Sequence, residues 1–210
     1  FALRRHALVV LRLLVECDLP LPLDATLDRV AEVFGPRIAA VRPALSDFME
    51  DRLAGSLREQ GYSAQEVESV LALKPQRLGE VPRRLAAVRG FAGLPEAAAL
   101  AAANKRIANI LKKAPEVDAH VSEVLLQEPA EIALHAAMQD VLPQAQALFE
   151  AGDYTGSLQA LAQLRAPVDA FFDGVMVNAE ALDLRLNRQG LLKCLYLAMN
   201  RVADLSRLAA

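Results

Sequence analysis

The fold class of this chain is decided by stretches such as Pro129–Glu150, which reads PAEIALHAAMQDVLPQAQALFE. Its apolar side chains recur at the spacing of an α-helix, at Ile132, Leu134, Met138 and Leu142. The same periodicity runs through almost the whole chain, whereas strict alternation over the length of a strand is hard to find. The sequence therefore predicts an all-α fold.

Residues that favour helix ends divide this pattern into segments. Gly61 is typical of a helix C-terminus, and the sequence SAQE at Ser63–Glu66 has the pattern of a capping box that starts the next helix. Gly152 and Asp153 have the same roles between two later helices. We expect helices over residues 2–16, 25–40, 44–60, 64–73, 76–92, 95–113, 129–150, 154–165, 167–178 and 182–207.

The composition is typical of a globular protein. The 210 residues are 54% hydrophobic, 23% charged and 5% aromatic. This length suffices for one large or two small domains, and Pro95 disfavours a helix at the residue before it. We therefore divide the chain near residue 92, into a helical segment over residues 1–92 and a helical bundle over residues 93–210.

The sequence disfavours membrane and disulfide-rich proteins. No apolar run approaches the ~20 residues of a membrane span. Cys17 and Cys194 lie far apart, which fits a reducing, cytosolic compartment, and we expect both to pack among leucines. The opening residues read as the interior of an amphipathic helix and not as a signal peptide, so we expect the chain to be a fragment of a longer protein.

Charge is distributed unevenly, although the net charge is only −3. Residues 74–113 carry nine basic and two acidic side chains, whereas residues 114–183 carry one basic and twelve acidic side chains. Lys105 and Lys112 lie on one side of their predicted helix, with Asn109 between them. The basic segment is therefore a candidate surface for phosphate groups, with an amide that can pair with base edges.

A purely structural explanation of the same cations stays open. Lys112 and Lys113 would stabilise a helix C-terminus, and Arg83 and Arg84 would form ion pairs with neighbouring carboxylates. Aromatic residues are few, so any platform that stacks unpaired bases is expected to be small. We assign the pair Phe171–Phe172 to the core.

The sequence has no pattern typical of a catalytic or metal site. His6, His120 and His135 are dispersed, and no phosphate-binding loop or nucleophile motif occurs. Asp169 and Asp173 share a helix face but have no partner base, so we interpret Asp169 as a charge that favours the first turn of its helix. We expect no catalytic residue and no metal ligand in this chain.

Five blocks of sequence resemble one known family. They read, in order, AALAAANKRIANILKK (98–113), LQEPAEIAL (126–134), VDAFFDGVMV (168–177), LRLNR (184–188) and VADLS (202–206). Together with LRRHAL at 3–8 and EQGYS at 59–63, they resemble the C-terminal region of the β subunit of bacterial glycyl-tRNA synthetases.

This resemblance implies a helical body segment over residues 1–92 that leads into a DALR-type anticodon-binding helical domain over residues 93–210. In that family the β subunit binds tRNA, and a separate α subunit activates glycine with ATP and Mg²⁺. The resemblance therefore implies that tRNA for glycine and the α subunit are partners in the bacterial cytoplasm. It implies no membrane and no cofactor in this chain.

The resemblance also implies that cations hold phosphates and that amides meet the edges of unstacked anticodon bases. The candidate tRNA-binding residues are Asn104, Lys105, Arg106, Asn109, Lys112, Lys113, Arg77, Arg84, Arg185, Asn187 and Arg188. Asn104 and Asn187 could equally satisfy buried backbone groups. The acidic segment 114–183 is expected to face away from RNA or to contact a partner subunit.

Two other functions stay open. The first is a helical interaction module that docks another subunit without RNA specificity. The second is an independent enzyme acting on nucleotides, for which we expect no turnover. Salt separates the first from RNA binding, because phosphate contacts weaken steeply as salt rises and apolar docking does not.

Overall fold

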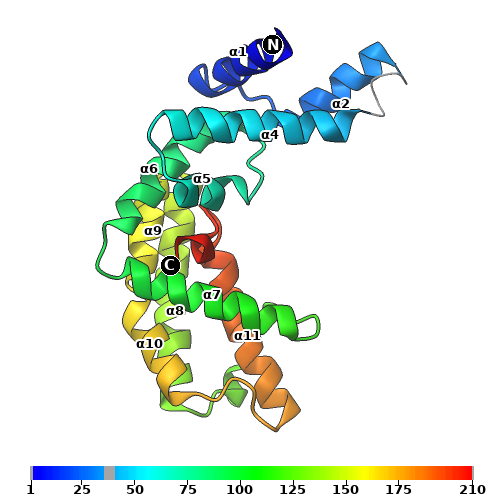
Figure 1. The fold of residues 1–210 in the computed structure, drawn as a ribbon. Coiled ribbons are helices and arrows are strands. Elements are labelled where there is room, and N and C mark those ends of the chain that lie inside the picture. Colours follow the sequence, from blue (N-terminus) through cyan, green and yellow to red (C-terminus); the bar gives the residue numbers. More distant parts are fainter. Residues whose placement is uncertain (1, 36–40, 210) are drawn as a thin grey trace. The chain divides into compact units, whose positions relative to one another are not determined.

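A computed structural model describes residues 2–35 and 41–209 of the chain (Figure 1). Every regular element in these ranges is a helix, which confirms the predicted all-α class. The α-helices are α1 (Ala2–Glu16), α2 (Leu23–Phe34), α4 (Arg42–Glu59), α5 (Ala64–Leu71), α6 (Val81–Ala92), α7 (Ala97–Lys113), α8 (Pro129–Glu150), α9 (Tyr154–Ala162), α10 (Arg165–Gly174) and α11 (Leu182–Met199). Short 3-10 turns occur at η1 (Leu78–Glu80), η2 (Glu123–Leu125) and η3 (Leu205–Leu208).

The predicted helix ends at residues 61–66 and 152–153 are confirmed. Ser63 Oγ accepts a hydrogen bond from the Glu66 amide at 3.2 Å, and the Glu66 carboxylate accepts one from the Ser63 amide at 2.7 Å. Gly61 has a φ of 91°, in the left-handed region that favours glycine after a helix. Asp153 caps α9 by accepting from the Gly156 amide at 2.8 Å.

Two predicted helices are too long. The segment predicted over 76–92 forms η1 and then α6, which begins only at Val81. The segment predicted over 182–207 ends at Met199, because the Asn200 side chain turns the chain. Its Nδ2 donates to the Tyr196 carbonyl at 2.7 Å, and its Oδ1 accepts from the Leu205 amide at 3.0 Å.

The predicted helix over 25–40 is observed as α2, which ends at Phe34 before Gly35, a residue with a φ of 73°. The rest of that prediction, residues 36–40, lies outside the described residues.

Cys17 is exposed, so the expectation that it packs among leucines is wrong, whereas Cys194 is half-buried. No single helix in the described ranges has the length and hydropathy of a membrane span, although residues 78–92 and 97–113 taken together meet that test.

Residues 1–86 and 87–210 form two compact units, called the first and second unit below. In the first unit, α1 and α5 pack on α4, and η1 packs on α1. Its core contains Leu11, Leu14, Met49, Leu53, Leu57, Val67, Val70 and Leu78.

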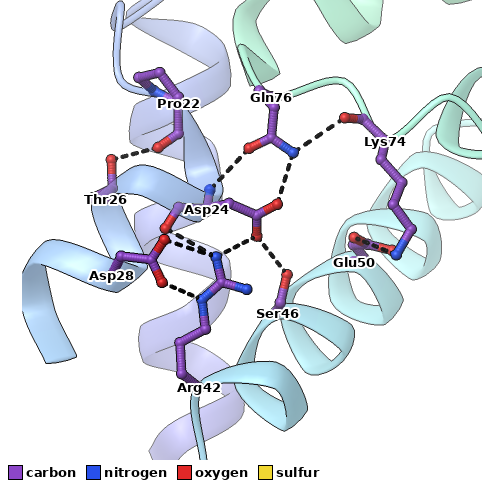
Figure 2. A network of polar contacts seen from close by, with 9 residues as sticks. All are labelled: Pro22, Asp24, Thr26, Asp28, Arg42, Ser46, Glu50, Lys74 and Gln76. Carbon is purple, nitrogen blue, oxygen red and sulfur yellow. Dashed lines mark hydrogen bonds and ion pairs between the residues drawn. The ribbon is translucent and has the colours of Figure 1, made fainter. Parts of the chain in front are cut away.

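A polar network joins α2 to α4 and to the segment before η1 in the first unit (Figure 2). Asp24, in the first turn of α2, accepts from Ser46 of α4 at 3.0 Å and from Gln76 Nε2 at 2.9 Å. The Gln76 Oε1 in turn accepts from the Asp24 amide at 3.0 Å. Arg42, at the start of α4, pairs with Asp24 at 3.2 Å and with Asp28 at 2.6 Å. This network, whose side chains are exposed or half-buried, therefore links α2, α4 and the segment before η1.

The second unit is built around the antiparallel neighbours α8 and α9, with α10 and α11 packed on α8 and α7 packed on α10, α11 and η3. Its fully buried side chains include Leu100, Ile107, Leu134, Leu158, Phe171, Leu191, Leu195 and Met199. Phe171 is in the core as predicted, whereas Phe172 is half-buried and meets it edge-on at 5.6 Å between ring centroids.

Candidate nucleic-acid interface

A groove of about 590 Å³ lies in the second unit, between α7 and the start of α11. We call it the α7–α11 groove. Its polar lining consists of Lys105, Arg106, Asn109, Lys113, Asn178, Arg185 and Gln189. Five of these side chains are candidates from the sequence, and the structure brings them together: Lys105, Arg106, Asn109, Lys113 and Arg185.

The pattern of α7 explains why cations line this groove. Ala101, Asn104 and Ile107 form the buried side of the helix, whereas Lys105 and Asn109 are exposed one turn apart on another side. Small alanines on the buried side allow the helix to pack closely against the rest of the unit. The amphipathic helix therefore directs its polar side chains into the groove.

The groove is positively charged. Of the described residues that line it, four are lysine or arginine and none is acidic. Arg106 lies over the Phe172 ring of α10, 4.2 Å from its centroid, which holds the guanidinium by a cation–π contact. Arg185 donates to the Ala179 carbonyl at 3.1 Å. Two of the cations are therefore positioned by the protein itself, which suits a preformed site for an anionic chain.

Lys112 is exposed but is not part of the groove lining, although Lys113 next to it is. Both lie in the last turn of α7, where a cation also stabilises the helix C-terminus. The two explanations of the basic segment therefore apply together to α7.

Two asparagines among the candidates serve the fold instead of the surface. Asn104 is fully buried and exchanges two amide hydrogen bonds with Asn200, at 2.8 and 3.0 Å. Asn187 accepts from the Ser122 amide at 2.7 Å and donates to the Ser122 carbonyl at 3.1 Å. In this conformation neither amide is available to an external base, and Asn187 has the alternative role of satisfying buried backbone groups.

Arg188 is also internal. Its guanidinium donates to the Glu131 carboxylate at 3.0 and 3.2 Å and to the Met176 carbonyl at 3.0 Å. Glu131 is fully buried and also accepts from the Gln127 and Glu128 amides, each at 2.7 Å. Burial alone would raise the pKa of Glu131, but the hydrogen bonds from Arg188 and the two amides outweigh it and hold that pKa below its ordinary value. The pair fixes α11 to the start of α8.

Arg77 and Arg84 belong to the first unit. Arg84 is almost fully buried and pairs with Glu80 at 3.0 Å, and Arg77 pairs with Asp18 at 3.0 Å. Arg83 lies 3.9 Å from the same Asp18 carboxylate. The expected alternative, ion pairing with neighbouring acids, therefore describes the contacts of these arginines in the structure.

Sequence reasoning missed three residues of this region: Asn178, Gln189 and Phe172, the ring beneath Arg106. Gln189 follows the candidate Arg185 by one helical turn, so helical spacing could have identified it. Asn178 lies between α10 and α11, where spacing gives no signal.

A second, mostly apolar groove of about 740 Å³ runs along α8 and includes His120, His135 and Cys194. Although the two histidines are dispersed in the sequence, they therefore meet at one surface. Within the described ranges no cluster of three or more potential metal ligands occurs.

Burial raises the pKa of the Cys194 thiol, which lowers its reactivity. Asp169 pairs with Arg165, one turn earlier on α10, at 3.4 Å.

Comparison with known proteins gives two family matches. Residues 1–72 match the family described as glycyl-tRNA synthetase beta subunit, and residues 100–205 match the DALR anticodon binding domain. The second match covers the helices that form the α7–α11 groove.

Curated relatives agree with these matches. The chain is 74% identical over 211 residues to the glycine–tRNA ligase beta subunit of Polaromonas naphthalenivorans and 69% identical over 209 residues to that of Paracidovorax citrulli. It is 66% identical to the corresponding subunit of Leptothrix cholodnii. Each alignment covers 100% of this chain and 30% of the relative, so the chain spans less than a third of their length.

Proposed function

Because the chain belongs to the glycyl-tRNA synthetase β-subunit family and carries a DALR anticodon-binding domain, we propose that its second unit binds the anticodon region of tRNA for glycine in the α7–α11 groove. One observation carries the proposal: the groove, within the DALR match, is lined by four cations and two asparagines, with no carboxylate among the described lining residues. Cations neutralise the phosphates of an RNA loop, and amides meet the edges of its unstacked bases.

The proposed role is recognition, without bond-making by this chain. Lys105, Lys113 and Arg185 hold phosphates and fix the register of the loop, and Asn109 meets a base edge. Glycine activation, with ATP and Mg²⁺, belongs to a separate α subunit in this proposal, and this chain holds no cofactor. The proposed compartment is the bacterial cytoplasm, where tRNA is charged.

Binding of the 210-residue chain to tRNA for glycine, at two salt concentrations, tests the proposal. We expect a log–log salt slope of roughly −0.7 per phosphate contact, and weaker binding when anticodon bases are changed. The double variant Lys105→Ala/Lys113→Ala should lose most of the affinity. Arg165→Gln removes a cation from α10 outside the groove and is the matched control. Equal, salt-insensitive binding of all RNAs would refute the proposal.

A second role, docking to another part of the synthetase, is favoured by the apolar surface of the first unit. Val9, Val10 and Leu13 of α1 are each about half exposed, and Val33 and Phe34 of α2 are more exposed still. Exposed apolar clusters of this kind mark protein contacts. We propose that these helices contact protein, and the variant Val9→Ser/Leu13→Ser should weaken assembly with the α subunit while leaving tRNA binding by the second unit unchanged.

A further inference from the structure

A phenylalanine ring supports one of the cations that line the α7–α11 groove. Arg106 of α7 is exposed and lines the groove, and its Cζ lies 4.2 Å from the centroid of the Phe172 ring of α10. Phe172 is half-buried and is not among the described lining residues. The guanidinium therefore covers the ring on the side of the groove, and its other face is accessible from there.

The ring beneath Arg106 is anchored in the core of the second unit. Phe172 meets Phe171 edge-on, with 5.6 Å between the ring centroids, and Phe171 is fully buried. Val168, one turn earlier on α10, is fully buried as well. A guanidinium is planar, stacks on aromatic faces and is more weakly hydrated than an ammonium group. The fold thus presents a supported, planar group to the groove.

The rest of the lining favours a base as the partner of this planar group. Lys105, Lys113 and Arg185 already supply positive charge for phosphates. No aromatic side chain occurs among the described residues that line the groove, so an unpaired base finds no ring on which to stack there. Unpaired bases of RNA loops stack on aromatic rings or on the guanidinium planes of arginines. Arg106 supplies the second kind of surface.

We propose that Arg106 and Phe172 form a stacking site for one unpaired base, which lies on the guanidinium face that points away from the ring. The inference rests on the proposed function, and it gives Arg106 a role other than neutralising phosphate. Phe172 is the positioning residue beneath the guanidinium. Asn109 follows Arg106 by three residues and also lines the groove, so its amide lies beside the edge of the stacked base. Stacking tolerates every base, so Arg106 adds affinity and Asn109 adds selectivity.

The variant Arg106→Lys separates stacking from charge, because lysine keeps the charge but lacks the planar group. The 210-residue chain with this change should bind tRNA for glycine about five- to tenfold more weakly, with an unchanged log–log salt slope. Arg201→Lys is the matched control. Arg201 also lies over a phenylalanine, 4.8 Å from the Phe149 centroid, but it is outside the α7–α11 groove. This control should bind as tightly as the original chain.

An abasic nucleotide removes the stack from the RNA side and keeps the phosphates. When each anticodon base is removed in turn, the original chain should lose about five- to tenfold in affinity at one position. Arg106→Lys should lose little more at that position, because its stack is already absent. Phe172→Leu should reproduce part of this behaviour, since the guanidinium then lacks the ring that positions it.

The outcomes separate the two proposals. If the original chain binds every abasic tRNA as tightly as the unchanged tRNA, the proposed function fails and the stacking site fails with it. If it distinguishes them, but Arg106→Lys keeps both the affinity and the abasic losses, the stacking site is overturned and the proposed function stands. Arg106 is exposed, so its replacement does not disturb the core, and the decision does not depend on whether Phe172→Leu folds.

Discussion

Arginine and carboxylate join helices in both units, but in opposite environments. In the first unit, Arg42 pairs with Asp28 at 2.6 Å, with side chains that are 24% and 61% exposed (Figure 2). In the second unit, Arg188 pairs with Glu131 at 3.0 Å, with side chains that are 6% and 0% exposed. Water and salt screen the first pair and hardly reach the second. The shorter contact is therefore the one that we expect to matter less.

Burial also separates the structural from the candidate RNA-binding residues within the second unit. The second unit commits Asn104, Asn187 and Arg188 to its interior and leaves Lys105 and Lys113 at the groove. Residues of the same chemical type thus have different roles, which only burial distinguishes.

Removing one partner of the buried pair should have the largest effect. Glu131→Ala leaves the Arg188 guanidinium buried without its carboxylate and should lower the free energy of unfolding by about 3–5 kcal/mol. Chemical denaturation of the chain measures this. The double variant Glu131→Leu/Arg188→Met removes both charges and should recover part of the loss, because the Gln127 and Glu128 amides still lack their acceptor. A single variant as stable as the double would show that the pair carries no such cost.

The buried pair of Glu131 and Arg188 should also make the stability of the chain depend on pH in the acid range. Because the pKa of Glu131 is below its ordinary value in the folded chain, the unfolded chain binds more protons at about pH 4. The resulting stabilisation is complete above the ordinary carboxylate range and is lost as the pH falls through the lowered pKa. Unfolding midpoints measured between about pH 2 and pH 6 should therefore fall more steeply for the original chain than for Glu131→Leu/Arg188→Met. Parallel curves would contradict the assigned direction.

Asn104→Ala should separate stability from binding. Truncation leaves the Asn200 amide without its partner on α7 and should cost about 1–3 kcal/mol of stability. Because the side chain is fully buried, the affinity of the folded chain for tRNA should stay the same. Denaturation and tRNA titration of one preparation provide both values. A selective loss of affinity would return Asn104 to the RNA contacts.

The distance along the chain decides which of these features the sequence could predict. The capping box of Ser63 and Glu66 is local chemistry, and its prediction is confirmed. Asn104 finds its partner 96 residues away, and Arg188 finds Glu131 57 residues away. No spacing rule connects such positions, so cations and amides on a helix look alike in the sequence whether they face a groove or the core.

The same limit applies to the groove. Helical spacing placed Lys105 and Asn109 together on α7, and both line the groove. The second wall comes from α11 and the segment before it, whose approach to α7 depends on buried contacts. Gln189 was missed for this reason, because it reaches the groove only through the packing of α11 in the folded chain.

Neighbouring lysines at the end of α7 provide a smaller test. Lys113 lines the groove and Lys112 does not, although both are exposed. Lys113→Ala should weaken binding to tRNA for glycine by about two- to fivefold and reduce the log–log salt slope by roughly 0.7, as expected for one lost phosphate contact. Lys112→Ala removes the same charge from the same helical turn and should change both values less. Equal effects would mean that RNA senses the net charge of α7 and not the groove.

The smallest effect should come from the first unit. Asp28→Asn weakens the ion pair with Arg42, but Asp28 is 61% exposed and Arg42 keeps Asp24 at 3.2 Å. We therefore expect a loss of stability below about 0.5 kcal/mol, which disappears at high salt. Denaturation at low and high salt measures both. A loss near that of Glu131→Ala would mean that the polar network of Asp24, Arg42, Ser46 and Gln76 acts cooperatively. Burial alone would then no longer explain why the two units differ.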